Sequence, residues 1–282
     1  METNVTTFNN FTNVVREPAN VTFNGVTKEI NKDVLLNEDT GEILGVVGKG
    51  YKLVQNSEVR DFFDTAFENY NVEVLADHSS NNHSKWVREI VFNDDQFSRE
   101  IVPGDNVKVK LKAWNGYDGI TSVGFALESY RLVCSNGMMG WGKLFSTRLP
   151  HVGSGIVDTI KNTFQNSFQN YNKVFDKFAD WTKKPYDEKD FKTFITTKTK
   201  EEGEKTSAMK FLSEKQADAI KGFYPVVMNK FNESNENLWT AYNVLTYIAS
   251  HETATKNTDS HLFTQGYGRM TKLTESFIKE VA

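Results

Sequence analysis

Two stretches of alternating side chains, separated by turn signals, constrain the fold of this 282-residue chain most. In residues 107–114 apolar side chains alternate with lysines up to Trp114, and residues 123–127 repeat the apolar positions. Successive side chains of a strand point to opposite faces, so this spacing is typical of strands with one apolar face. Asn-Gly at 115–116 and Asp-Gly at 118–119 favour tight turns between them. The sequence therefore predicts a long antiparallel hairpin.

The second face of this hairpin allows two interpretations. It carries Lys108, Lys110 and Lys112, followed by Trp114. Lysines keep surface strands soluble and discourage edge-to-edge pairing, so a solvated strand face is one interpretation. Ammonium groups beside an indole are also typical of surfaces that hold single-stranded nucleic acid, where cations contact phosphates and rings stack on bases. The pattern alone leaves both interpretations open.

On the second interpretation, a local basic surface surrounds the hairpin. Residues 101–155 contain six Lys and Arg against three Asp and Glu, whereas the whole chain has a formal net charge of −4. Only such a local surface could contact phosphates, and its binding would be salt-sensitive. The candidate nucleic-acid-binding residues are Lys49, Lys52, Lys108, Lys110, Lys112, Trp114, Tyr117, Arg131, Lys143 and Arg148.

The order of strand and helix signals predicts an α+β fold, with an antiparallel sheet in the first half and mostly helices in the second. Residues 1–30, rich in Asn and Thr, are expected to form a mobile arm that could dock on another subunit. Residues 31–182 are expected to form the α+β core, and residues 183–282 a helical region. Within the core, residues 156–181 predict one long helix, because apolar and aromatic side chains recur every three or four residues. This stripe comprises Ile160, Phe164, Phe168, Tyr171, Phe175 and Phe178.

The hydropathy, the first residues and the cysteine count together predict the cellular compartment of the protein. No run of eighteen apolar residues occurs, so no membrane-spanning helix is expected. The first residues lack the basic and apolar regions of a secretory signal. The one cysteine, Cys134, excludes an internal disulfide framework and favours a reducing cytoplasm.

Catalytic signals are weak throughout the sequence. Cys134 could act as a nucleophile with His151 or His251 as base and Asn136 to orient it, but a lone cysteine is more often a small buried side chain. His251-Glu252 lacks the second histidine of a zinc helix, and the Asp94-Asp95 pair is typical of a solvated turn. We therefore expect no enzyme activity, no metal and no cofactor.

Four segments follow one another in a specific order along the chain: Val46–Lys52, Asn115–Gly119, Tyr130–Met138 and Leu238–Thr246, followed by His251. In this order they resemble a family of phage- and plasmid-encoded proteins known as a domain of unknown function, DUF932. The resemblance covers roughly residues 40–280 and implies a mobile genetic element as the source. The family often carries histidine where this chain has Tyr117.

A looser likeness is architectural. A helix, strands with a long hairpin and then a long helix are similar to the core of phage single-strand annealing proteins, in which a hairpin and a helix line a basic groove. This likeness implies a phage protein that binds single-stranded DNA in recombination or replication. It also implies a homo-oligomer, with host or phage replication proteins as further partners. The alternative hypothesis is a protein-binding accessory or anti-defence factor that binds no nucleic acid.

Overall fold

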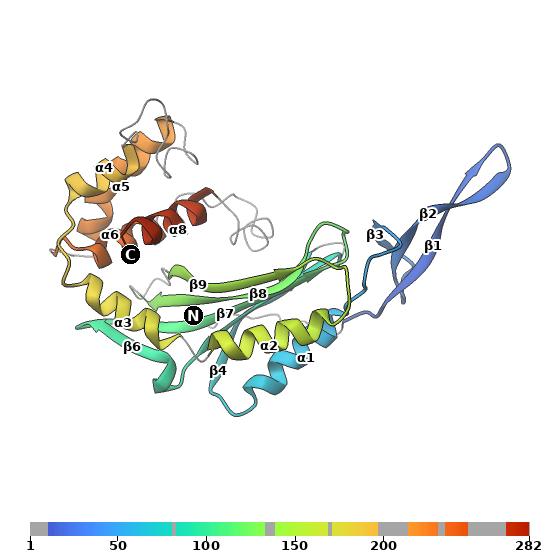
Figure 1. The fold of residues 1–282 in the computed structure, drawn as a ribbon, viewed down its shortest axis with the longest axis horizontal. Helices are drawn as coiled ribbons and strands as arrows, with labels where there is room; N and C mark the ends of the chain where they lie inside the picture. The colour runs from blue at the N-terminus through green and yellow to red at the C-terminus, as the bar shows by residue number, and fades with distance from the viewer. Residues whose placement is uncertain are drawn as a thin grey trace. The chain divides into compact units, whose positions relative to one another are not determined.

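The computed structural model describes residues 11–80, 83–132, 139–168, 171–196, 214–230, 235–247 and 269–281 (Figure 1). The chain divides into two compact units whose segments alternate along the sequence. Unit 1 comprises Met1–Asp94, Lys110–Leu127 and Phe145–Gln169, and unit 2 comprises Asp95–Val109, Glu128–Leu144 and Asn170–Ala282. Among the described residues, no helix is long and apolar enough to cross a membrane.

Sheet A, in unit 1, is a three-stranded antiparallel sheet of order β1-β2-β3. Its strands are β1 (Val14–Phe23), β2 (Val26–Asn37) and β3 (Ile43–Val47). β1 and β2 join through Asn24 and Gly25, which both have positive φ, at 49° and 78°. Asn-Gly suits this two-residue turn because both residues tolerate left-handed backbone. Figure 1 shows β1 and β2 as a long twisted hairpin.

Sheet A has two parts. Near its base β3 pairs with β2, and one face of the base is a small core. The core consists of Val14, Leu35, Leu44, Val47, Tyr51 and Tyr117, with Leu53 packed against it. Past a register shift between Pro18 and Asn20, only β1 and β2 pair. We call this two-stranded part, residues 20–32, the ribbon.

The second sheet has six strands in the order β4-β5-β7-β8-β9, with β6 paired to β7. Its strands are β4 (Val72–Ser79), β5 (Lys85–Phe92), β6 (Ser98–Val102), β7 (Asp105–Gly116), β8 (Val123–Leu132) and β9 (Met139–Leu149). β7 and β8 are neighbours, so the predicted central hairpin is confirmed. β7 and β8 each contribute residues to both units.

Aromatic rings hold helices α1 (Asn56–Phe67) and α2 (Ile156–Phe168) on the apolar face of this sheet in unit 1. The ring centroid of Phe63 in α1 lies 5.9 Å from that of Phe125 in β8 and 5.4 Å from that of Phe164 in α2. Phe67 lies 4.8 Å from Phe92 of β5. These edge-to-face contacts each add about 0.5–1.5 kcal/mol beyond area burial.

Unit 2 is mainly helical. Its described helices are α3 (Asn172–Trp181), α4 (Glu188–Thr196), α5 (Glu214–Lys230), α6 (Leu238–Tyr247) and α8 (Arg269–Val281). All ten residues of α6 are buried, as expected of a helix surrounded by protein. Trp239 of α6 lies 4.8 Å from Phe178 of α3, and Trp181 lies 5.3 Å from Tyr242, between ring centroids.

The α+β prediction is confirmed, but three details differ. The predicted long helix is two helices, because Phe164 and Phe168 pack in unit 1 whereas Phe175 and Phe178 pack in unit 2. Residues 14–30 form strands instead of a mobile arm, since the Asn-Gly turn closes a hairpin there. The two interleaved units also do not follow the predicted boundaries at residues 30 and 182.

Candidate functional site

The sequence predicts that the lysine face of β7 is exposed. At Lys110 and Lys112 this face is instead part of a buried ion cluster. The register places Glu89 of β5 opposite Lys112, and Val91 opposite Lys110. Glu89 Oε2 lies 3.1 Å from Lys110 Nζ, and Glu89 Oε1 lies 3.1 Å from Lys112 Nζ. Lys110 is 0% exposed, and the other two are also buried. The prediction that these lysines face solvent is therefore wrong, because a carboxylate on the neighbouring strand holds both ammonium groups inside. Lys108 is half-buried.

The charges of this cluster depend on one another. Burial alone would raise the pKa of Glu89, but the two ammonium groups outweigh it and hold that pKa well below its usual range. A buried charge left without its partner costs about 3–5 kcal/mol. The cluster thus fixes the pairing of β5 with β7 and offers no free cation to a phosphate.

The two aromatic candidates are also inside. The indole of Trp114 packs on Gly124, where an added Cβ would lie 2.7 Å from Trp114 Cζ2. Arg148 lies over the same ring, with Cζ 5.9 Å from its centroid. Tyr117 is 2% exposed, and its hydroxyl accepts a 2.7 Å hydrogen bond from the Asn56 backbone N–H. Neither ring can stack on a base, so this part of the prediction is wrong.

Arg131 is buried in unit 2, where it forms an ion pair with Asp105. Trp239 of α6 donates from Nε1 to Asp105 Oδ2 at 2.9 Å, and its ring lies 5.6 Å from Arg131 Cζ. Asp105 thus links β7, β8 and α6. The assignment of Arg131 to a nucleic-acid surface is wrong, because its guanidinium is buried against Asp105 and Trp239.

The remaining candidate nucleic-acid-binding residues differ in whether their charged groups are paired or exposed. Lys49 Nζ lies 2.7 Å from Asp33 and 2.9 Å from Glu29, so its charge is matched within sheet A. Lys52 and Arg148 are exposed. The side chain of Lys143, and the possible catalytic residues Cys134, Asn136 and His251, lie outside the described residues.

Segments that carry the family resemblance meet at one junction in unit 1. The hydroxyl of Tyr51 donates to the Gly116 carbonyl at 2.9 Å. Asn115 Nδ2 donates to the Val54 carbonyl at 2.8 Å and to Asn56 Oδ1 at 2.9 Å. The junction therefore ties the segment between β3 and α1 to the β7–β8 turn. Its hydrogen bonds position backbone, which is a structural role.

His151 closes the junction from the end of β9. Its ring stacks on Tyr51, with centroids 4.6 Å apart and planes inclined by 14°. Nδ1 lies 2.9 Å from the Lys52 carbonyl, so Nδ1 carries the proton, and the Lys52 N–H donates back to the His151 carbonyl at 2.7 Å. Nε2 is buried with no hydrogen-bond partner. Burial lowers the pKa of His151, although the Lys52 carbonyl and Asp118 act in the opposite direction.

Sheet A exposes an apolar surface that the sequence reasoning missed. Six of the nine large apolar side chains that are exposed among the described residues lie on its strands. At the base, the register aligns Val15 with Leu36 and Ile43, and Val34 with Val46. Ile43 and Val46 are 60% and 53% exposed, and the other three are half-buried. These five aliphatic side chains share one face, which we call the outer face.

The ribbon has an apolar face of its own. Phe23 pairs with Val26 and Val21 pairs with Lys28, so these four side chains share a face, and Ile30 follows on it by alternation. We call these five residues the ribbon face; Phe23 is 74% exposed and Val26 is 57% exposed. The opposite face is polar, with Thr22 and Thr27 hydrogen-bonded at 2.8 Å. Alternating residues around Asn24-Gly25 were the sequence signal for this hairpin.

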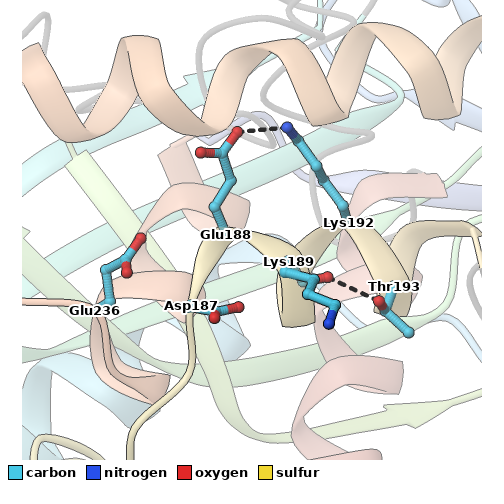
Figure 2. A pocket seen from close by; sticks show the side chains of 6 residues that line it. All are labelled: Asp187, Glu188, Lys189, Lys192, Thr193 and Glu236. Carbon is cyan, nitrogen blue, oxygen red and sulfur yellow. Dashed lines mark hydrogen bonds and ion pairs between the residues drawn. The ribbon is translucent and has the colours of Figure 1, made fainter.

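A polar depression of about 550 Å³ opens beside α4 in unit 2 (Figure 2). It is lined by Asp187, Glu188, Lys189, Lys192, Thr193 and Glu236. Glu188 pairs with Lys192 at 2.5 Å, and Asp187 Oδ1 accepts from the Asp190 N–H at 2.8 Å. These contacts cap and brace the start of α4. Within the described ranges, no group of three or more His, Cys, Asp or Glu could hold a metal ion.

The fold is therefore of the α+β class. It contains the hydrogen-bonded junction at the β7–β8 turn and, in sheet A, the two-stranded ribbon. A sequence profile described as "Domain of unknown function (DUF932)" matches residues 43–273, so the protein belongs to this family. No curated protein and no solved structure matches the chain. The match begins at the first residue of β3, so β1 and β2 lie outside it, whereas the junction lies within it.

Replacing Glu89 with glutamine should lower the free energy of unfolding by roughly 3–5 kcal/mol, because two buried ammonium groups lose their counter-charge. Denaturant unfolding measures this loss. The control is Glu73→Gln on neighbouring β4, where the glutamate is exposed and the change should stay within about 0.5 kcal/mol. Equal losses in the two variants would contradict the cluster's role.

Stability should also depend on pH through His151. Its pKa is lower in the folded chain than the usual 6.5, so the unfolded chain binds the extra proton first. The free energy of unfolding should be highest above about pH 6.5 and fall as the pH drops below it. Urea unfolding between pH 5 and 8 tests this, and His151→Gln should reduce the slope of the free energy of unfolding against pH. If His151→Gln shows the same pH dependence of the free energy of unfolding as the wild type, another group is responsible for it.

Proposed function

We propose that this protein functions by binding other proteins, and that the apolar surface of sheet A is the binding surface. The observation that carries the proposal is the concentration of exposed aliphatic and aromatic side chains on this one sheet. Scattered apolar side chains are normal on protein surfaces, but a contiguous patch marks an interaction site. A sheet with apolar residues on both faces is usually covered by a second layer on each. Here the second layer would come from the partner.

The charges of sheet A indicate what kind of partner fits. Arg16 and Lys49 both pair with Asp33, and Lys49 also pairs with Glu29. Asp33 lies on the core side of the base, so these pairs are made away from the outer face. The outer face is mainly aliphatic, and Glu17, which lies directly opposite Val34, adds one exposed carboxylate to it. Such a face suits an apolar strand or helix surface of another protein and offers little to a polyanion.

The biological setting of this proposal follows from the resemblance to phage- and plasmid-encoded proteins. A protein-binding factor encoded by a mobile element would act either as an accessory protein of that element or as an inhibitor of a defence protein of the host cell. Its place of action would be the cytoplasm of the infected bacterium, in keeping with a sequence that has one cysteine. No reaction chemistry is required for such a role.

The outer face can be tested with a pair of matched variants. Tagged full-length protein is incubated with nuclease-treated host lysate, and retained proteins are quantified by mass spectrometry. Ile43→Lys with Val46→Lys should reduce a specifically retained protein at least about tenfold, because ammonium groups would be buried without partners. The control, Asn20→Lys with Asn31→Lys, adds the same charge at exposed polar positions of sheet A and should retain the protein. Equal retention by both variants would refute the proposal.

Single-stranded DNA binding is a second proposal, favoured by one observation. Arg148 is an exposed guanidinium held over the Trp114 ring, and exposed Lys52 is a further cation. These two groups could contact phosphates, whereas the buried Lys110 and Lys112 cannot. The aromatic stacking part of the earlier hypothesis is not retained, because both rings are buried.

The DNA proposal predicts weak, salt-dependent binding. Fluorescence anisotropy with a labelled poly-thymidine oligonucleotide at low salt should show binding that falls steeply as salt is added. Arg148→Ala should weaken it about fivefold or more, since one exposed cation contact contributes on the order of 1 kcal/mol. Lys28→Ala, on the ribbon, is the matched control and should leave binding unchanged. Absence of binding by the wild-type chain at low salt would remove this proposal.

A further inference from the structure

We propose that the ribbon face binds a second copy of this chain, so that two ribbons pack face to face. The proposal rests on the protein-binding function above and names the partner for one part of sheet A. The face is formed by Val21, Phe23, Val26 and Ile30, with Lys28 among them. It consists of other residues than the outer face, which lies at the base of the sheet beyond the register shift.

The ribbon is expected to be stable only if another layer of protein packs on its apolar face. A two-stranded antiparallel hairpin is marginally stable in water unless a further strand or layer packs on it. β3 pairs with β2 only over Asp33–Leu36, and β1 pairs with β2 alone, so the described residues add no third strand to the ribbon. All seven residues from Val26 to Lys32 are exposed. One ordered face of apolar side chains is thus left in contact with water.

A second ribbon is chemically suited to cover this face. The ribbon itself, residues 20–32, carries Lys28 and Lys32 against Glu29, a net charge of only +1. Two ribbons with so little charge repel one another only weakly, whereas nucleic acid or an anionic lipid surface selects for clustered positive charge. Charge therefore favours a second copy over either polyanion.

The order of side chains along the ribbon also fits two-fold packing. Phe23 and Val26 flank the turn, Val21 and Lys28 form the next row, and Ile30 lies furthest from the turn. A two-fold axis through the middle row brings the Phe23 and Val26 row of one copy against Ile30 of the other. The two Lys28 side chains then lie near the axis, where their aliphatic stems pack and their ammonium groups reach water.

The size of the face sets the expected strength. A standard protein interface involves about 20–30 residues on each side, and the ribbon face has far fewer. The dimer should therefore be weak and depend on concentration. It should also be lost when charge is placed in the middle of the face, because an apolar contact of this size cannot bury unpaired ammonium groups.

Sedimentation velocity of the full chain, from about 1 to 100 μM, tests the proposal, because weak dimers dissociate in this range. The wild type should show a concentration-dependent species of twice the mass of one chain. Phe23→Lys with Val26→Lys should abolish it and raise the dimer dissociation constant at least about tenfold. The matched control, Thr22→Lys with Thr27→Lys, adds the same charge one residue away on the opposite face and should dimerise within about threefold of the wild type.

Each other outcome overturns the proposal. A wild-type chain that stays monomeric throughout, or two double variants that dimerise equally well, shows that the ribbon face does not bind a second copy. Ribbon-dependent binding to lipid vesicles by a monomeric chain assigns the face to a membrane surface instead. Circular dichroism of the variants checks that both remain folded. The lysate experiment on Ile43 and Val46 is independent, so the protein-binding proposal can stand if dimerisation fails.

Discussion

The placement of Glu89 between Lys110 and Lys112 constrains the protein more than any other interaction. It holds three charges inside unit 1, where ions persist only if they are paired. The pairing fixes the β5–β7 register and turns a basic strand face into an internal feature of the sheet. It also changes the functional interpretation of the chain, because two of the three lysines of β7 no longer present their charge to solvent.

The junction around Tyr51 and Asn115 has a comparable role for sheet A. The segment after β3 and the β7–β8 turn meet there through hydrogen bonds to backbone carbonyls, and His151 stacks on Tyr51. Gly45 shows how close the contact is, since an added Cβ would lie 2.0 Å from the Tyr117 carbonyl oxygen. Two of the segments that carry the family resemblance, Val46–Lys52 and Asn115–Gly119, therefore attach a small sheet within unit 1.

The candidate site shows where sequence reasoning succeeded and where it failed. Alternation correctly separated the two faces of β7, because side-chain direction in a strand is local. It could not show that Glu89, twenty-one residues before Lys110, would lie opposite the lysines, because strand pairing is set by the whole sheet. The ribbon was missed for a different reason: its Asn24-Gly25 signal was present, but an Asn- and Thr-rich segment was interpreted by composition instead of by period.

The sequence by itself determined the elements: an α+β chain, the central hairpin, the aromatic stripes and the family to which the chain belongs. These follow from residue periodicity and turn chemistry, which act over a few neighbours. Only the tertiary structure decided which faces are buried, that the aromatic stripe divides between two units, and that the open apolar surface lies on sheet A. Burial depends on partners far away in the sequence, and no local pattern specifies them.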